Sequence, residues 1–292
     1  MLQILHGAVS LGLLWALMTI GVFLTYRVLE FSDLTVDGSL VTGAAIAARM
    51  IMDGASPYLA TGVAILGGMA AGAATGLLHT KLKIPGLLSG ILTMIALYSV
   101  NIRIMGKANI SLLKIENVYT PLQALGMSQK NAVMVLGFVC VLVIVCVLYW
   151  FFGTELGSAI RATGNNPGMI RAQGVNTDTM VIIGLILSNG LVALSGALIA
   201  QYQQYADIQM GTGAIVIGLA SVIIGEVLFG KRNFFNNLIS LALGAIAYRI
   251  IIAFVLELGM ETTDLKLFTA ITVALALAMP VAKEKLNKLK KR

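Results

Sequence analysis

The most regular feature of the sequence is a succession of long apolar stretches separated by short polar segments. Nine stretches have, or nearly have, the length of about 17–25 residues that a helix needs to cross a bilayer. They cover approximately residues 4–26, 38–53, 58–79, 86–105, 132–152, 178–205, 213–229, 237–257 and 265–281. The second and the last two are short or have polar ends, and could instead be re-entrant. Because an open sheet would leave unpaired backbone groups in lipid, the pattern predicts an all-α bundle of about nine spans, within a range of eight to ten.

Composition excludes a soluble protein. Hydrophobic residues make up 58% of the 292 residues and charged residues only 11%, and the mean hydropathy is +0.92. A soluble domain carries about 25% charged residues, so this chain cannot cover itself with a hydrated surface. A soluble enzyme and a nucleic-acid-binding domain are therefore excluded. The prediction is a single transmembrane domain over 1–292 in contact with membrane lipid, whose first stretch is a retained span, because it has no basic leader or cleavage site.

The distribution of basic residues predicts the orientation in the membrane. Six of the last ten residues are Lys or Arg, so 283–292 is predicted to be a basic cytoplasmic tail beside anionic headgroups. With that tail inside, nine spans place the amino terminus outside. The connections carrying Arg27, Lys81 with Lys83, and Lys231 with Arg232 then also face the cytoplasm, as the positive-inside rule requires. The expected location is the bacterial inner membrane.

Two ridges of small residues mark the expected helix contacts. Gly68, Gly72 and Gly76 recur every fourth residue, and Gly218, Ser221 and Gly225 form a similar ridge in the seventh stretch. Small residues let membrane helices approach closely. The main expectation is ordinary packing of the bundle, and a sliding helix contact is the alternative.

One connection, 154–177, is too polar to cross the membrane and too long for a simple turn. Thr154 can cap a short helix over about 155–162, with Glu155 placed favourably in its first turn. Gly164 to Pro167 should end that helix, and a second short helix is expected from about 167 to 173, before Gly174. The segment predicts a rigid helix–turn–helix elbow that projects from the membrane and suits docking to a partner protein.

Catalytic and metal-binding patterns are weak. Gly225 to Lys231 has the spacing of a phosphate-binding loop, but Arg232 stands where Ser or Thr is required and no strand precedes it. Two distant histidines and Cys140 with Cys146 offer no metal-ligand spacing. The chain is therefore expected not to be an enzyme, and to hold no cofactor, no metal and no ATP of its own.

Several motifs resemble ABC importer permeases of the ribose and branched-chain amino acid class. In the polar connection these are Leu156-Gly157, Arg161-Ala162-Thr163-Gly164-Asn165-Asn166-Pro167, Ala172 and Gly174-Val175. Outside it they are the segments 33–39, 188–197 and 218–226. The last of these, with 201–207, is most similar to the subgroup associated with aromatic, tryptophan-type amino acid uptake.

This resemblance implies a homodimeric permease that works with two separate ATPase subunits, which would bind ATP and Mg, and with an extracytoplasmic substrate-binding protein. The elbow would couple to the ATPase. The residues implied in that coupling are Glu155, Leu156, Gly157, Arg161, Ala162, Thr163, Gly164, Asn165, Asn166, Pro167, Arg171 and Gly174. The alternative function is a secondary transporter driven by an ion gradient, although such carriers usually expose more ionisable groups at mid-membrane. A scaffold subunit without a transport path is a third possibility.

Polar residues within the apolar stretches are the candidates for the substrate path. They are Ser188, Asn189, Ser195, Gln201, Tyr202, Tyr205, Asp207, Glu226 and Arg249. Arg249 should be paired, because an arginine at this depth costs about 2.5 kcal/mol or more. A structural pair with Glu226 or Asp207 is favoured over contact with a substrate carboxylate. Asp33, Thr35 and Asp37 are expected chiefly to form a turn and a helix cap, with Asp37 as the capping residue. The alternative is that this segment lines the path if the helix is broken.

Overall fold

The computed structural model describes residues 2–230, 232–257, 267–274 and 278. Most of it is helical. The long helices are α1 (Leu2–Phe23), α2 (Thr35–Met52), α3 (Pro57–Thr80), α4 (Gly86–Met105), α6 (Gln129–Gly153), α9 (Thr177–Gln203) and α11 (Phe234–Glu257), together with the shorter α10 (Ala214–Phe229). Each of the first eight predicted stretches coincides with one of these helices to within about three residues. The prediction of an all-α bundle is confirmed.

Within the described residues, six helices are long and apolar enough to cross a membrane, namely α1 with its continuation, α3, α4, α6, α9 and α11. The second predicted stretch forms α2 and the seventh forms α10, which has only 16 residues. Residues 267–274 of the ninth stretch are helical, and the rest of that stretch and the basic tail over 283–292 lie outside the described residues. The count of nine spans stays a prediction.

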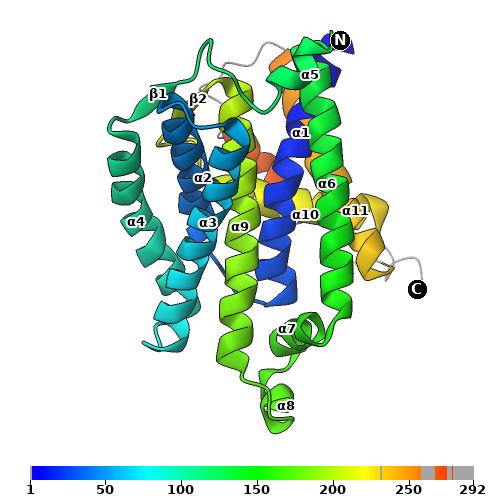
Figure 1. The fold of residues 1–292 in the computed structure, drawn as a ribbon. Helices are drawn as coiled ribbons and strands as arrows, with labels where there is room; N and C mark the ends of the chain where they lie inside the picture. The colour runs from blue at the N-terminus through cyan, green and yellow to red at the C-terminus, as the bar shows by residue number, and fades with distance from the viewer. Residues whose placement is uncertain (1, 231, 258–266, 275–277, 279–292) are drawn as a thin grey trace, which may run out of the picture.

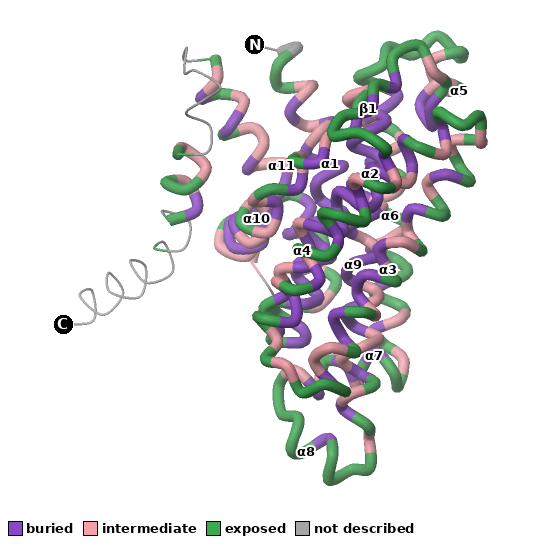
Figure 2. The backbone as a smooth tube through the Cα atoms, turned by 90° about the vertical axis from the view of Figure 1, so that its left-hand side faces the viewer, coloured by how far each residue is buried: buried purple, intermediate pink, exposed green. Residues whose placement is uncertain are grey.

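The bundle is built around α1 and α9, which pack against each other (Figure 1). Helices α2 and α3 contact α9, whereas α10 and α11 contact α1. Figure 2 shows the buried residues concentrated in these central helices. The glycine ridges lie in the contacts, as predicted: a Cβ at Gly72 would overlap the Leu185 backbone of α9, and one at Gly225 would overlap Ser240 of α11.

Two short strands lie at one end of the helical bundle. Strands β1 (Asn109–Ser111) and β2 (Tyr205–Asp207) form a short antiparallel pair with Ile110 opposite Ala206. The pair lies beyond the ends of α4 and α9, at the end of the bundle that also carries the short helix α5 (Thr120–Ala124) (Figure 1). The strand pairing provides hydrogen-bond partners for backbone groups in two connections whose structure the apolar pattern does not predict.

The same end is held together by two side chains from the loop and from α9. Tyr119 donates to the Leu198 carbonyl oxygen at 3.0 Å, and Gln201 accepts from the Val118 backbone at 3.1 Å. Gln201 also donates to Thr61 of α3 at 2.9 Å. Burial raises the pKa of Tyr119 well above its usual value, so this hydroxyl remains a neutral donor.

Candidate functional site

The polar connection forms the predicted elbow at the end of the bundle opposite β1 and β2 (Figure 1). Its two helices are α7 (Glu155–Asn165) and α8 (Pro167–Ala172). Thr154 caps α7 by accepting from the Gly157 backbone at 3.3 Å. Asn166 caps α8 by accepting from the Met169 backbone at 3.0 Å. These caps satisfy backbone N–H groups at the starts of both helices, which explains why the segment is helical although it is polar and has no hydrophobic core of its own.

The turn between the two helices differs from the prediction. Helix α7 continues through Gly164 to Asn165, so Gly164 is a helical residue and the turn lies at Asn166. The reason for glycine at 164 is packing, because a Cβ there would overlap the carbonyl oxygen of Val28. Gly157 is similarly constrained, by the Phe151 backbone. Thus α7 lies directly on the end of the π-helical segment η1 (Leu24–Val28) that continues α1.

Much of the outer surface of the elbow is exposed. In α8 only Ile170 is buried, and Figure 2 shows α8 as an exposed protrusion. Leu156 and Met169 are 52% and 47% exposed. The remaining predicted coupling residues divide between the two sides: Thr163 is buried, Ala162 and Gly164 are half-buried, and Glu155, Arg161, Asn165, Asn166, Pro167, Arg171 and Gly174 are exposed.

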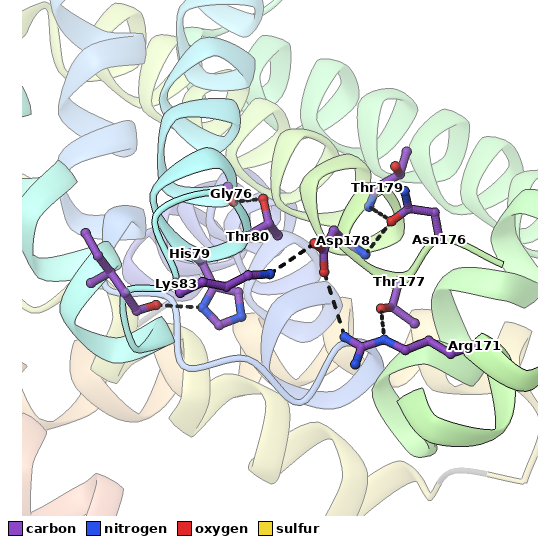
Figure 3. A network of polar contacts seen from close by, with 10 residues as sticks. Gly76, His79, Thr80, Lys83, Arg171, Asn176, Thr177, Asp178 and Thr179 are labelled. Atoms are coloured by element: carbon purple, nitrogen blue, oxygen red, sulfur yellow. Dashed lines mark hydrogen bonds and ion pairs between the residues drawn. The ribbon is translucent and has the colours of Figure 1, made fainter.

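A polar network ties the base of the elbow to two other helices (Figure 3). Asp178, in the first turn of α9, lies 3.3 Å from Lys83 of the α3–α4 connection and 3.8 Å from Arg171 of α8. Arg171 also donates to Thr177 at 2.7 Å. Asn176 caps α9 by accepting from two backbone groups. A displacement of α8 would therefore act on α9 and on the connection after α3.

A second connection joins η1, on which α7 packs, to α10. Arg27 of η1 forms an ion pair with Glu226, near the end of α10, at 2.6 Å. Both residues line a cavity of about 280 Å³ together with Arg161, which also stacks on Phe234 with its guanidinium carbon 4.9 Å from the ring centroid. The segment 225–230 belongs to helix α10 and its cap at Gly230, so the phosphate-loop spacing does not correspond to a loop.

Inside the bundle, the chain before α2 is not helical and reaches the middle of α9. Asp33 is buried, accepts from the Thr35 backbone at 2.9 Å, and accepts from Asn189 at 2.8 Å. Asn189 in turn accepts from Ser39 at 2.6 Å. Asp33 thus forms the predicted turn before α2, whose N-cap residue is Leu34. Asp37 was assigned to the wrong helix: it lies within α2, and its carboxylate accepts from the Gly213 and Ile215 backbones at the start of α10.

The candidate path residues of α9 take part in helix packing. Ser188 donates to the Gly21 carbonyl oxygen at 2.7 Å, and Ser195 donates to that of Leu14 at 2.8 Å. These bonds fix α9 to α1. Tyr202 is half-buried against the core, while Tyr205 is 41% exposed in β2. Asp207 accepts from Asn109 at 3.1 Å across the strand pair.

The expected ion pairs of Arg249 are not formed. Glu226 pairs with Arg27, Asp207 binds Asn109, and in the described part of the chain no acid lies within ion-pair distance of Arg249. Its guanidinium carbon instead lies 4.0 Å from the centroid of the Trp15 ring in α1, and its buried Nε has no hydrogen-bond partner. The sequence predicted that Arg249 has a partner but indicated the wrong one, because an aromatic face 234 positions away carries no local signal.

Comparison with known proteins assigns the class that this architecture suggests. The profile of the family described as branched-chain amino acid transport system, permease component, matches residues 4–281. The chain belongs to this family of ABC transporter permeases, as its motifs indicated, and it is a multi-pass membrane subunit that is not itself catalytic. This match excludes the alternative function, a secondary transporter driven by an ion gradient.

Two curated relatives are similar to the chain over most of its length, and one solved structure shares its fold. A tyrosine transport system permease protein of Clostridioides difficile is 42% identical over 91% of this chain and 88% of its own length. An uncharacterised protein of Rickettsia prowazekii is 34% identical over 95% of this chain and 98% of its own length. The fold is similar to a solved inward-facing ABC transporter assigned to the metal-chelate type, with a TM-score of 0.53, 15% identity, and coverage of 97% of this chain and 85% of the other.

Proposed function

We propose that this subunit forms the membrane path of an ABC importer that carries an amino acid with an aromatic side chain into the cell. The observation that carries the coupling half of this proposal is the elbow, because α7 is fixed to the bundle while α8 projects from it. The substrate class is supported by the 42% identity to a relative named as a tyrosine transport system permease.

The family assignment and the exposed elbow support a set of proposed partners. Two copies of the chain would enclose the path, two ATPase subunits would bind ATP and Mg, and a substrate-binding protein would deliver the solute. The elbow would dock on the ATPase through its exposed residues, including Leu156, Arg161, Met169 and Arg171. Movement of the ATPase pair would reach α9 through Asp178, and α1 through the contact between Gly164 and Val28.

The orientation is proposed from the same end of the molecule. Arg27, Lys83, Arg161 and Arg171 all belong to the elbow or to the segments that contact it. By the positive-inside rule this end faces the cytoplasm, which places the start of α1 and the strand pair outside. Tyr205 and Asp207 of β2 would then stand at the outer mouth of the path.

The test is reconstitution of the permease with its ATPase and binding protein in liposomes. We expect uptake of radiolabelled L-tyrosine to require ATP and the binding protein, and to continue when ionophores dissipate the ion gradients. Uptake that collapses with the ionophores and proceeds without ATP would contradict the proposal. The permease alone should not bind nucleotide, which equilibrium dialysis with radiolabelled ATP can measure.

A further inference from the structure

A cavity that none of the predicted path residues lines opens between α2, α4 and the segment before α10. Its volume is about 420 Å³, within the range of small-molecule pockets. Most of its wall is apolar, with Met94 and Ile95 from α4, but Asp37, Tyr98, Asn101 and Thr212 also line it. An apolar pocket with a few convergent polar groups is the usual form of a ligand site.

Asp37 brings a negative charge to this cavity. Its two carboxylate oxygens accept from the Gly213 and Ile215 backbones, each at 2.9 Å, so the start of α10 holds the carboxylate in place. Each oxygen keeps a lone pair for a further donor. Among the described residues, no Lys or Arg forms an ion pair with Asp37. An ionisable group within a membrane bundle generally marks a functional position.

Asn101 brings a second acceptor that lacks a donor. Its side chain is 1% exposed, and its amide nitrogen donates to the Gly38 carbonyl oxygen at 3.2 Å. That bond fixes Asn101 beside the residue that follows Asp37. The other end of the amide, Oδ1, is buried without a hydrogen-bond partner. Such a group is uncommon, because leaving a buried acceptor unpaired costs about 1–3 kcal/mol.

We propose that this cavity binds the α-ammonium group of the transported amino acid, with the Asp37 carboxylate and Asn101 Oδ1 as acceptors. A primary ammonium supplies the positive charge that Asp37 lacks and three N–H donors, so it can satisfy both groups together. The substrate side chain would lie along Met94, Ile95 and Tyr98. Ile95 and Tyr98 are 59% and 52% exposed, which leaves the cavity open on the α4 side. This inference rests on the proposed import of an amino acid and adds the group that is recognised.

The experiment measures initial rates of radiolabelled L-tyrosine uptake in liposomes that contain the complete transporter. Asp37→Asn removes the charge but keeps an oxygen that can cap α10, since Asn and Asp are comparable caps. We expect uptake to fall at least tenfold. Asp53→Asn is the matched control, because Asp53 caps the end of the same helix and, among the described residues, forms its ion pair with Arg49 on the surface. Its uptake should stay within twofold of wild type.

Ile95→Trp supplies a second, independent test, because it narrows the cavity from an exposed position and leaves both acceptors intact. We expect at least a fivefold loss of uptake with an unchanged melting temperature. Wild-type uptake by a folded Asp37→Asn complex overturns the inference, and if that variant does not fold, wild-type uptake by Ile95→Trp overturns it. A wild-type complex that carries no amino acid with ATP contradicts the proposed function itself, and the subsite with it.

Discussion

Asn189 donates a hydrogen bond to the buried carboxylate of Asp33 at 2.8 Å, although the two residues are 156 positions apart. The bond joins the middle of α9 to the non-helical chain before α2. Ser39 completes the arrangement by donating to the Asn189 side-chain oxygen at 2.6 Å. Irregular backbone at membrane depth is tolerated only where protein or water satisfies it. Asn189 therefore defines where the break between α1 and α2 can lie.

The first prediction concerns this bond. Asn189→Leu removes the donor to Asp33 and the acceptor of Ser39, and we expect the free energy of unfolding to fall by about 1.5–3 kcal/mol, the range for hydrogen bonds to charged groups. The measurement is thermal unfolding of the detergent-purified protein. Asn131→Leu, at an exposed position at the start of α6, is the control and should change stability by less than about 0.5 kcal/mol. Equal stability of the two variants would show that Asp33 is satisfied without Asn189.

The elbow offers a matched pair of glycines. Gly164→Ala places a methyl group against the Val28 carbonyl oxygen and should push α7 off the end of α1. Gly168→Ala, in α8, meets no atom closer than 3.5 Å. We expect the 164 variant to lose at least tenfold in substrate-stimulated ATP hydrolysis of the assembled transporter, and the 168 variant to stay within twofold. Similar rates for both would remove the contact between α7 and Val28 from the coupling route.

Local sequence signals predicted the elements of this fold well. Apolar length located the helices, and Thr154 predicted the start of α7 because a cap acts within a few residues of itself. The glycine ridges identified helix contacts, since only a small residue permits them. None of these signals identifies the partner across the contact. The predicted role of Gly164 was wrong for that reason: the sequence shows a glycine before Pro167, whereas the constraint comes from Val28.

The candidate site was predicted less completely than the fold. Ser188 and Ser195 have the spacing of one helix face, and the sequence cannot distinguish a face that lines a path from one that bonds to the backbone of α1. The residues around Asp37 indicate a helix cap. Its carboxylate instead accepts from the Gly213 backbone at the start of α10, 176 positions later. Asn101 is a polar residue within an apolar stretch, but the sequence does not show that its acceptor is unpaired, because that arrangement exists only once α2 and α4 are packed.

A third prediction concerns the network in Figure 3. Asp178→Ala removes the carboxylate shared by Lys83 and Arg171. These groups are largely exposed, so the global loss should be below about 1 kcal/mol. Hydrogen–deuterium exchange in α8 should nevertheless accelerate several-fold. Glu155→Ala is the control, since Glu155 also lies in the first turn of a helix but joins no described ion pair. Exchange in α8 that is equally fast in both variants would contradict a role for Asp178 in holding the elbow.

The last prediction separates two ways of accommodating Arg249. A cation–π contact with Trp15 contributes about 0.5–2 kcal/mol, whereas placing an arginine within a membrane helix costs about 2.5–3.5 kcal/mol. Arg249→Met removes the larger cost and keeps a long side chain, so we expect the melting temperature to stay the same or rise. The fluorescence of Trp15 should change at the same time, measured in a Trp150→Phe background, because Trp150 is the other tryptophan and is 72% exposed. A lower melting temperature with unchanged Trp15 emission would show that an ion pair, and not the aromatic ring, stabilises the guanidinium.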